Sequence, residues 1–136
     1  MSVNIILIDD DETTIFIHET LMKASNLLAD PISFRGSITT LNYLDNQYEA
    51  GTIADFLLLL DLNMPEVDGW GFLDIIHKKP YASRLSIIVV TSSIDTADRR
   101  RAMAYDQVIE HIEKPLDINR FNQLVQQFIN QKGEQQ

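Results

Sequence analysis

The 136-residue chain contains no cysteine, which excludes disulfides, cysteine-ligated zinc and a thiolate nucleophile. No apolar run approaches the roughly 18 residues of a membrane span. The run from Phe56 to Leu60, for example, is five residues long. The first residues also lack the basic region of a secretory signal. These absences predict a protein of the cytoplasm that does not insert into membranes.

Basic residues are scarce as well. The chain has 11 Lys and Arg against 20 Asp and Glu, which gives a net charge of −9. Residues 1–70 hold 12 acids and 2 bases, whereas residues 71–136 hold 8 acids and 9 bases. Proteins that bind nucleic acid or anionic membranes need a basic surface to displace counterions. Neither kind of partner is expected, and the excess acid of the first half needs another explanation.

Short continuous apolar runs are the clearest pattern in the chain, whose length suits one domain around a single core. Such runs are typical of strands buried on both faces of a parallel sheet. They predict central strands at Ile5–Ile8, Phe56–Leu60 and Ile87–Val90. Two shorter and more polar strands are predicted at the sheet edges, at Ile32–Arg35 and Val108–Ile112.

Stretches with helical spacing lie between the strands. In the first of them, the spacing of Ile17, Leu21, Ala24 and Leu28 predicts a buried stripe. Further helices are predicted over residues 38–48, 70–77, 95–105 and 118–128. Five strands alternating with five helices predict an α/β fold with a doubly wound five-stranded parallel sheet, in the flavodoxin-like order 2-1-3-4-5. Residues 1–130 form the one predicted domain, and residues 131–136 a frayed tail.

Polar residues follow the apolar runs, at the edge of the sheet where such folds bind ligands. Asp9 and Asp10 follow the first strand, Asp61 follows the third, and Lys114 follows the fifth. The first and third strands are neighbours about 4.8 Å apart, so the three acids should share one pocket and repel one another unless a proton or cation intervenes. An all-oxygen site beside a lysine suits Mg²⁺, and its carboxylates are possible nucleophiles toward phosphorus.

Four motifs carry this chemistry in a characteristic order and spacing. They are Ile8-Asp9-Asp10-Asp11-Glu12, Leu60-Asp61-Leu62-Asn63-Met64-Pro65-Glu66-Val67-Asp68-Gly69, Thr91-Ser92-Ser93 and Glu113-Lys114-Pro115. Together they resemble the bacterial response-regulator receiver domain, typified by CheY, over residues 3–130. The resemblance implies a CheY-like fold and a role in two-component signalling.

The resemblance also implies a phosphoacceptor and a cation site. Asp61 would accept a phosphoryl group from a sensor histidine kinase or a histidine phosphotransfer protein. Asp9, Asp10 and Asp61, with the backbone carbonyl of Asn63, would hold Mg²⁺. Asn63 and Ser93, which flank the site, are the positions where the hydrolysis rate is expected to be tuned.

Further roles in the family fall on the last two strands. Thr91 would hydrogen-bond the phosphoryl group and Lys114 would pair with it, and the peptide bond before Pro115 is expected to be cis. The surface made by the fourth helix, the fifth strand and the fifth helix would bind an unknown downstream protein. The resulting hypothesis is a stand-alone receiver, a signalling switch and not an enzyme, which catalyses only its own phosphorylation and slow dephosphorylation.

The histidines need separate interpretation. The family usually has Tyr or Phe at the position of His111, where the aromatic ring swings inward as the threonine moves. We hypothesise that His111 retains a switching role with a protonation-sensitive rotamer. The alternative is an ordinary strand histidine. His18 and His77 have no partner at metal-ligand spacing and are expected at the surface or at helix caps.

Three other functions share parts of this pattern. A flavodoxin-type electron carrier needs a loop rich in Ser, Thr or Gly after the first strand, where this chain has four acids. A haloacid-dehalogenase-like phosphatase needs an acid two residues after its nucleophile, where Asn63 stands. The alternative of a receiver-fold scaffold that works without phosphorylation stays open. The residues show that the site could be phosphorylated, but not that the protein uses phosphorylation.

Overall fold

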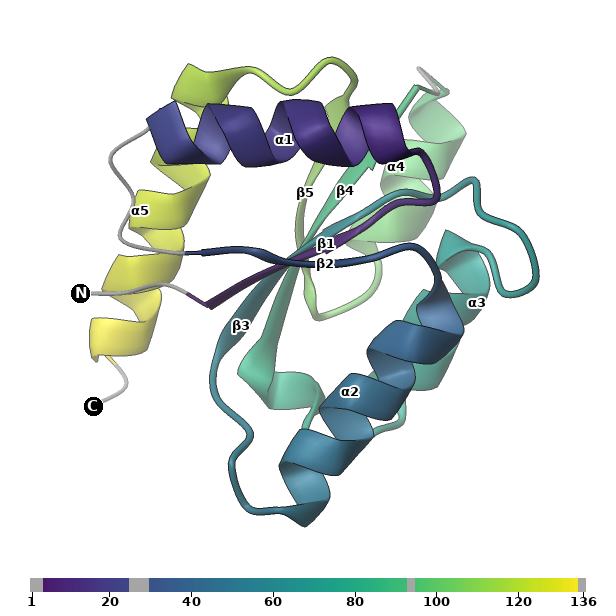
Figure 1. The fold of residues 1–136 in the computed structure, drawn as a ribbon, viewed down its shortest axis with the longest axis vertical. Coiled ribbons are helices and arrows are strands. Elements are labelled where there is room, and N and C mark those ends of the chain that lie inside the picture. The colour runs from purple at the N-terminus through teal and green to yellow at the C-terminus, as the bar shows by residue number, and fades with distance from the viewer. Residues whose placement is uncertain (1–3, 25–29, 93–94, 135–136) are drawn as a thin grey trace.

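The computed structural model describes residues 4–24, 30–92 and 95–134. Within them, five strands alternate with five α-helices, and a 3₁₀ turn precedes the fourth strand (Figure 1). The elements are β1 Asn4–Ile8, α1 Glu12–Ala24, β2 Ile32–Phe34, α2 Ser37–Glu49, β3 Phe56–Leu60, α3 Gly69–His77, η1 Ala82–Arg84, β4 Leu85–Thr91, α4 Thr96–Met103, β5 Val108–Glu113 and α5 Ile118–Glu134.

The strands form one parallel sheet in the order β2-β1-β3-β4-β5. Helices cover both of its faces, because one buried cluster joins the sheet to α2, α3 and α4 and the other joins it to α1 and α5. The predicted α/β class, the doubly wound sheet and the flavodoxin-like order are therefore confirmed. In the described part of the chain, no helix combines the length and apolarity needed to cross a bilayer.

The central strand β3 shows why the core strands appear as unbroken apolar runs. All five of its residues are buried. Leu58 and Leu60 pack into the cluster with α2, α3 and α4, whereas Leu57 and Leu59 pack into the cluster with α1 and α5. Successive strand side chains point to opposite faces. A sheet covered on both faces therefore requires an apolar residue at every position, not at alternate ones.

The predicted buried stripe of α1 is correct only at Leu21, which is partly buried against the cluster with α5. Ile17 is 46% exposed and Ala24 is exposed too, whereas His18 and Met22, one helical turn apart, are buried. Leu28 lies outside the described residues. The helix thus turns its His18–Met22 side to the sheet, and the sequence interpretation missed it because histidine was not treated as a core residue. The expectation that His18 lies at the surface or at a cap is wrong for the same reason.

The last helix follows its predicted pattern. Phe121, Val125 and Phe128 are buried against the sheet, and Ile118 packs partly against the same cluster. The helix runs to Glu134, within the segment 131–136 that the sequence predicts to be a frayed tail. Gln135 and Gln136 lie outside the described residues.

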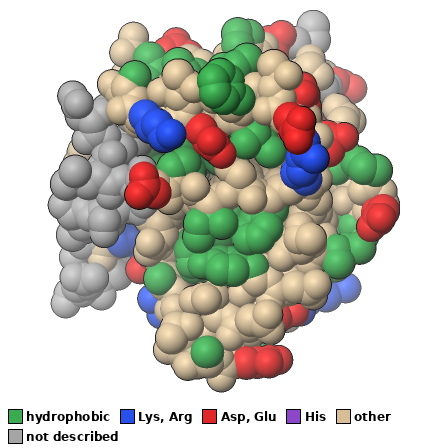
Figure 2. All heavy atoms as spheres, in the orientation of Figure 1, with side chains coloured by type: hydrophobic (Ala, Val, Ile, Leu, Met, Phe, Trp, Pro, Cys, Tyr) green, Lys and Arg blue, Asp and Glu red, His purple; other side chains and the backbone are tan. Residues whose placement is uncertain are grey.

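The short edge strand β2 is supported by aromatic side chains. The rings of Phe34 and Tyr43 lie 5.3 Å apart, and those of Tyr43 and Phe56 lie 6.1 Å apart, so the contacts join β2, α2 and β3. Figure 2 shows a central patch of hydrophobic side chains on this face of the molecule, with smaller separate areas near its upper edge and right side. Aromatic pairs at these distances stabilise their elements beyond simple burial, so they support a strand of only three residues.

Candidate functional site

Backbone hydrogen bonds place two acids at the carboxyl ends of neighbouring strands. The N–H of Asp9 donates to the carbonyl of Phe34 at 3.1 Å, and the N–H of Asp61 donates to the carbonyl of Ile8 at 3.0 Å. The parallel pairing of β1 with β2 and β3 thus continues one residue beyond the strands. Asp9 and Asp61 are both buried, so sheet geometry holds two carboxylates side by side at one edge.

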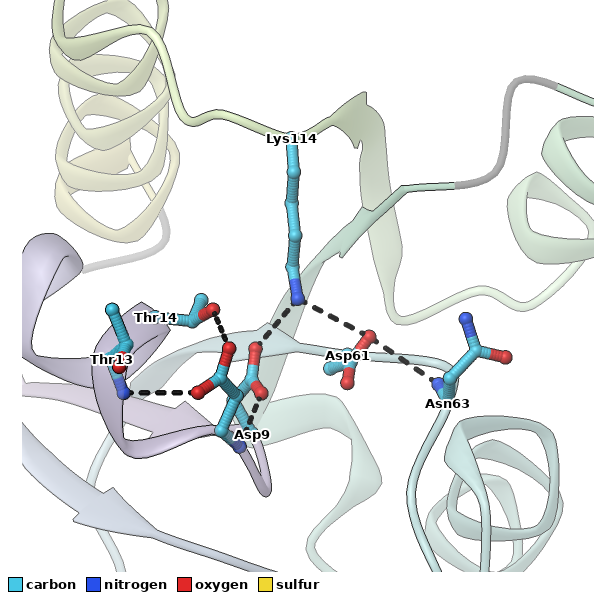
Figure 3. A network of polar contacts seen from close by, with 7 residues as sticks. Asp9, Thr13, Thr14, Asp61, Asn63 and Lys114 are labelled. Atoms are coloured by element: carbon cyan, nitrogen blue, oxygen red, sulfur yellow. Dashed lines mark hydrogen bonds and ion pairs between the residues drawn. The ribbon is translucent and has the colours of Figure 1, made fainter.

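Lys114 follows β5, the outer strand of the sheet, and its side chain reaches toward this pair. Its backbone N–H donates to the carbonyl of Thr91 at 2.8 Å. Its Nζ lies 2.9 Å from Oδ2 of Asp9 and 3.6 Å from Oδ1 of Asp61, and Figure 3 shows the ammonium between the two acids. The peptide bond between Lys114 and Pro115 is cis, as predicted. The structure therefore brings the predicted lysine to the predicted acids.

The three acids Asp9, Asp10 and Asp61 form one cluster. Each offers a carboxylate oxygen, and these atoms all lie within 4.8 Å of one another. Asp10 is exposed, so the cluster opens to solvent on its side. With Lys114 the four charges sum to −2, and the oxygen-only donor set fits a hard divalent cation. The three acids lie together as predicted. We call them, with Lys114, the acidic pocket.

The electrostatics of the pocket agree with this excess of negative charge. Burial, followed by the neighbouring charge of Asp9, raises the pKa of Asp61, and Lys114 only partly offsets the effect. Burial acts to lower the pKa of Lys114, but its hydrogen bond to Asp9 and the charges of Asp9 and Asp61 outweigh burial and raise that pKa. The lysine stays charged, while the carboxylate of Asp61 is less stable in its ionised form than an isolated carboxylate.

The loop after β3 holds the pocket from one side. The N–H of Asn63 donates to Oδ1 of Asp61 at 3.3 Å. Gly69 lies so close to the loop that an added Cβ would stand 2.6 Å from the Cα of Leu62, and its N–H donates to the carbonyl of Leu62. Asp68 caps α3 by accepting from the N–H two residues after Gly69. Asp68 thus starts α3, and the missing side chain of Gly69 lets the helix lie directly against the loop.

A strained residue also lies in this loop. Glu66 has a φ of 66°, in the left-handed region that non-glycine residues rarely adopt. Nothing in the sequence predicts this conformation, because glutamate is not a residue typical of it. A role for the Asn63 carbonyl as a cation ligand stays a prediction, since the contact described above involves its N–H.

The acids that follow Asp10 are the start of α1 and not part of the cluster. Asp11 accepts from the N–H of Thr13 at 3.0 Å and from the hydroxyl of Thr14 at 2.9 Å. These hydrogen bonds, led by the one from Thr14, lower the pKa of Asp11. Glu12 pairs with Arg35. Part of the acidity of the first half is therefore ordinary helix capping and surface pairing.

Thr91 and His111 lie on the same face of the sheet. Val89 pairs with His111 and Thr91 with Glu113, and paired residues of parallel strands point to the same side. Thr91 is fully buried and His111 is 9% exposed. The two residues of the predicted switch are thus close on adjacent strands, but movement of either stays a prediction. Ser93 lies outside the described residues.

His18 is a buried residue near the site that the sequence interpretation missed. Together with Thr14, Ile17, Lys114 and Pro115 it lines a pocket of about 240 Å³ between α1 and the loop after β5. Burial sets the pKa of His18 below the usual value for histidine; the charge of Asp9 acts in the opposite direction, and that of Lys114 in the same direction as burial. The signal available in the sequence was the spacing of His18 and Met22, four residues apart. His77, by contrast, is exposed as expected.

Comparison with known proteins identifies the family. Residues 5–126 match the model of the response regulator receiver domain. Response regulator Rcp1 of Synechocystis sp. is 28% identical over 95 residues, which make up 69% of this chain and 65% of Rcp1. The sensor histidine kinase CheAY of Helicobacter pylori is 31% identical over 78 residues, which make up 57% of this chain and 10% of the kinase. The matched region thus spans less than two thirds of each of these relatives.

Solved structures give the same result. A two component response regulator from Cytophaga hutchinsonii superposes with a TM-score of 0.85 at 28% identity, covering 96% of this chain and 99% of that one. The Mn²⁺-bound form of Rcp1 superposes with a TM-score of 0.72 at 25% identity, covering 91% and 89%. The fold and the acidic pocket define a CheY-like α/β domain. The chain belongs to the response regulator receiver domain family.

Proposed function

We propose that this receiver domain is a phosphorylation-controlled switch that accepts a phosphoryl group on Asp61 from a phosphohistidine. The donor would be a sensor histidine kinase or a histidine phosphotransfer protein. One observation carries the proposal: a buried carboxylate with a raised pKa lies 3.6 Å from a lysine ammonium and shares its pocket with two more acids. Such an arrangement is costly for folding and suits a group that reacts with a charged substrate.

The chemistry follows from the positions of these groups. A carboxylate oxygen of Asp61 attacks phosphorus, the P–N bond of the phosphohistidine breaks, and the electron pair leaves with the imidazole nitrogen. The product is an acyl phosphate on Asp61 and a free histidine on the donor. Lys114, already 3.6 Å from Oδ1 of Asp61, would pair with the transferred oxygens.

The acidic cluster supports a magnesium ion as the cofactor. Asp9, Asp10 and Asp61, with the carbonyl of Asn63, are the residues that would hold it. When bound, the ion supplies positive charge that offsets both the acids and the phosphoryl oxygens. The chain's own part is to hold the carboxylates at one edge of the sheet, which the backbone bonds of β1 and β3 do.

Phosphorylation adds about −1.5 to −2 charges to the pocket. The hydroxyl of Thr91, which is buried at the carboxyl end of β4, would move toward the new oxygens, and His111 on the same face would respond. The surface of α4, β5 and α5 would then change its affinity for a downstream protein. The protein would act as a signal carrier and not as an enzyme with turnover. Its location in the cytoplasm stays a prediction from the sequence.

Intact-mass measurement tests the proposal without a known kinase. The protein is incubated with acetyl phosphate and Mg²⁺, and a species heavier by about 80 Da, the mass of one phosphoryl group, is expected. Asp61→Asn should not form it. Asp68→Asn is the matched control, because Asp68 lies in the same motif, is exposed and only caps α3. Absence of the heavier species from the wild-type protein would favour the scaffold alternative.

A further inference from the structure

A cluster of charged side chains joins α4, β5 and α5 away from the acidic pocket. Glu110 on β5 lies 2.8 Å from Arg99 of α4 and 2.5 Å from Arg120 of α5. Arg99 also donates to the carbonyl of His111 at 2.9 Å. The side chain of Glu110 is largely buried, whereas both arginines are partly exposed. We call Arg99, Glu110, His111 and Arg120 the β5 cluster.

His111 is the unusual member of this cluster. Its Nε2 is buried and has no hydrogen-bond partner, one of two such side-chain atoms in the described residues. A neutral imidazole leaves one donor or one acceptor unpaired there, which costs a modest amount of free energy. A protonated imidazole has two N–H donors and a full charge, so the same position would be far less favourable. The buried position of His111 thus suits only the neutral ring.

The surroundings of the ring strengthen this preference. The pairing of β4 and β5 turns His111 toward the face that α4 covers. Burial, followed by the charge of Arg99, lowers the pKa of His111, while Asp98 of α4 and Glu110 of β5 act in the opposite direction. α5 contributes Arg120, which is held by Glu110. The nearest residues of β4, Val89 and Thr91, carry no charge.

We propose that His111 is a proton-controlled latch of α4: the neutral imidazole stays buried and keeps α4 against β5, whereas the protonated imidazole turns to water and loosens α4. The movement requires no phosphoryl group. Acidification and phosphorylation would therefore act on the same output surface by separate routes. The latch can be tested without Mg²⁺ or a phosphodonor, so its failure is distinguishable from failure of the proposed function.

An NMR titration of the unphosphorylated protein from pH 8 to pH 5 is the experiment. The chain has three histidines, so the ring signals are few enough to assign by substitution. We expect His111 to titrate below the pKa of 6.5 of a free imidazole and the amide signals of Thr96–Met103 to follow the same midpoint. His111→Gln should abolish the change in α4. His77→Gln, which alters an exposed histidine, should leave that change intact.

Charge substitutions separate titration from a merely structural effect. Arg99→Gln removes the positive charge that lowers the pKa of His111 and should move the midpoint to higher pH. The neighbouring Arg100→Gln is the matched control and should not move it. If His111→Gln is poorly folded, His111→Phe keeps a ring without titratable nitrogens and should also lack the pH response of α4. A His111 midpoint at or above 6.5, α4 signals that do not follow it, or an α4 response that persists in both His111 variants would overturn the latch.

Discussion

Replacing the central carboxylate should make the metal-free protein more stable, the reverse of most buried substitutions. Asp61→Asn removes one negative charge and keeps nearly the same shape. The carboxylate oxygens of the three acids lie within 4.8 Å of one another, and two unit charges at that limiting distance repel by about 3.5 kcal/mol with an effective dielectric constant of about 20. The attraction between Asp61 and Lys114 at 3.6 Å is about 4.6 kcal/mol on the same scale.

The repulsion between the acids and the attraction to Lys114 together determine how much stability the variant should gain. Two neighbouring acids repel Asp61 by about 7 kcal/mol together, which exceeds the attraction to Lys114 by about 2 kcal/mol. Water screens the exposed Asp10, but burial of the Asp61 charge adds a cost in the same direction as the repulsion. We therefore expect Asp61→Asn to raise the free energy of unfolding by about 1–2 kcal/mol at pH 7. For 136 residues this corresponds to about 4–7 °C in Tm.

Urea unfolding in EDTA, followed by the fluorescence of the single tryptophan Trp70, measures this difference. Because the folded-state pKa of Asp61 is raised, the folded protein binds its proton more tightly than the unfolded chain. The advantage of the variant should therefore be complete above that pKa and disappear as the pH falls toward 3.8.

Added Mg²⁺ should reduce the difference in the free energy of unfolding between Asp61→Asn and the wild-type protein. A cation at ten times its Kd stabilises the wild-type protein by about 1.4 kcal/mol, and the variant, which lacks one ligand charge, should gain less. Asp106→Asn, at an exposed acid far along the chain from the pocket, is the control and should change little. Equal or lower stability of Asp61→Asn in EDTA at pH 7 would refute the electrostatic reasoning.

Three further outcomes follow from other contacts. Gly69→Ala should cost about 1–3 kcal/mol in chemical denaturation because its Cβ meets backbone, whereas Gly71→Ala, whose Cβ meets a movable side chain, should cost less. Tyr81→Phe should lose about 1 kcal/mol, because the buried phenol donates to Asp45 at 2.7 Å. The lowered pKa of His18 means that the unfolded chain binds its proton more tightly, so stability should fall as the pH drops below about 6.5. His18→Leu should reduce this loss of stability between pH 7.5 and 5.5. An unchanged pH dependence of stability in the variant would contradict the prediction.

The central sheet and the acidic pocket were predictable from the sequence for one physical reason. A strand covered on both faces must be apolar throughout, and the residue after it stands at the ligand-binding edge. The four leucines before Asp61 therefore located both the strand and the candidate phosphoacceptor. Lys114 could be placed in the same pocket because it follows another strand of the same sheet.

Features that depend on contacts between elements were not predictable in the same way. Which side of α1 faces the sheet depends on how the helix packs against it. His18 is therefore a core residue, although histidine as a type favours neither the core nor the surface. The β5 cluster depends on how far arginines reach from α4 and α5, which periodicity does not describe. The positive φ of Glu66 reflects loop closure between β3 and α3 rather than a preference of glutamate.

The contacts around Glu110 have a consequence for association between molecules. β5 is an outer strand of the sheet, and such strands expose backbone groups with which strands of other chains can pair. At His111 both groups are occupied by side chains, because its N–H donates to Glu110 at 2.9 Å and its carbonyl accepts from Arg99. An incoming strand would have to displace both partners. The charged side chains that join three elements of the domain thus also protect this edge of the sheet against extension by another chain.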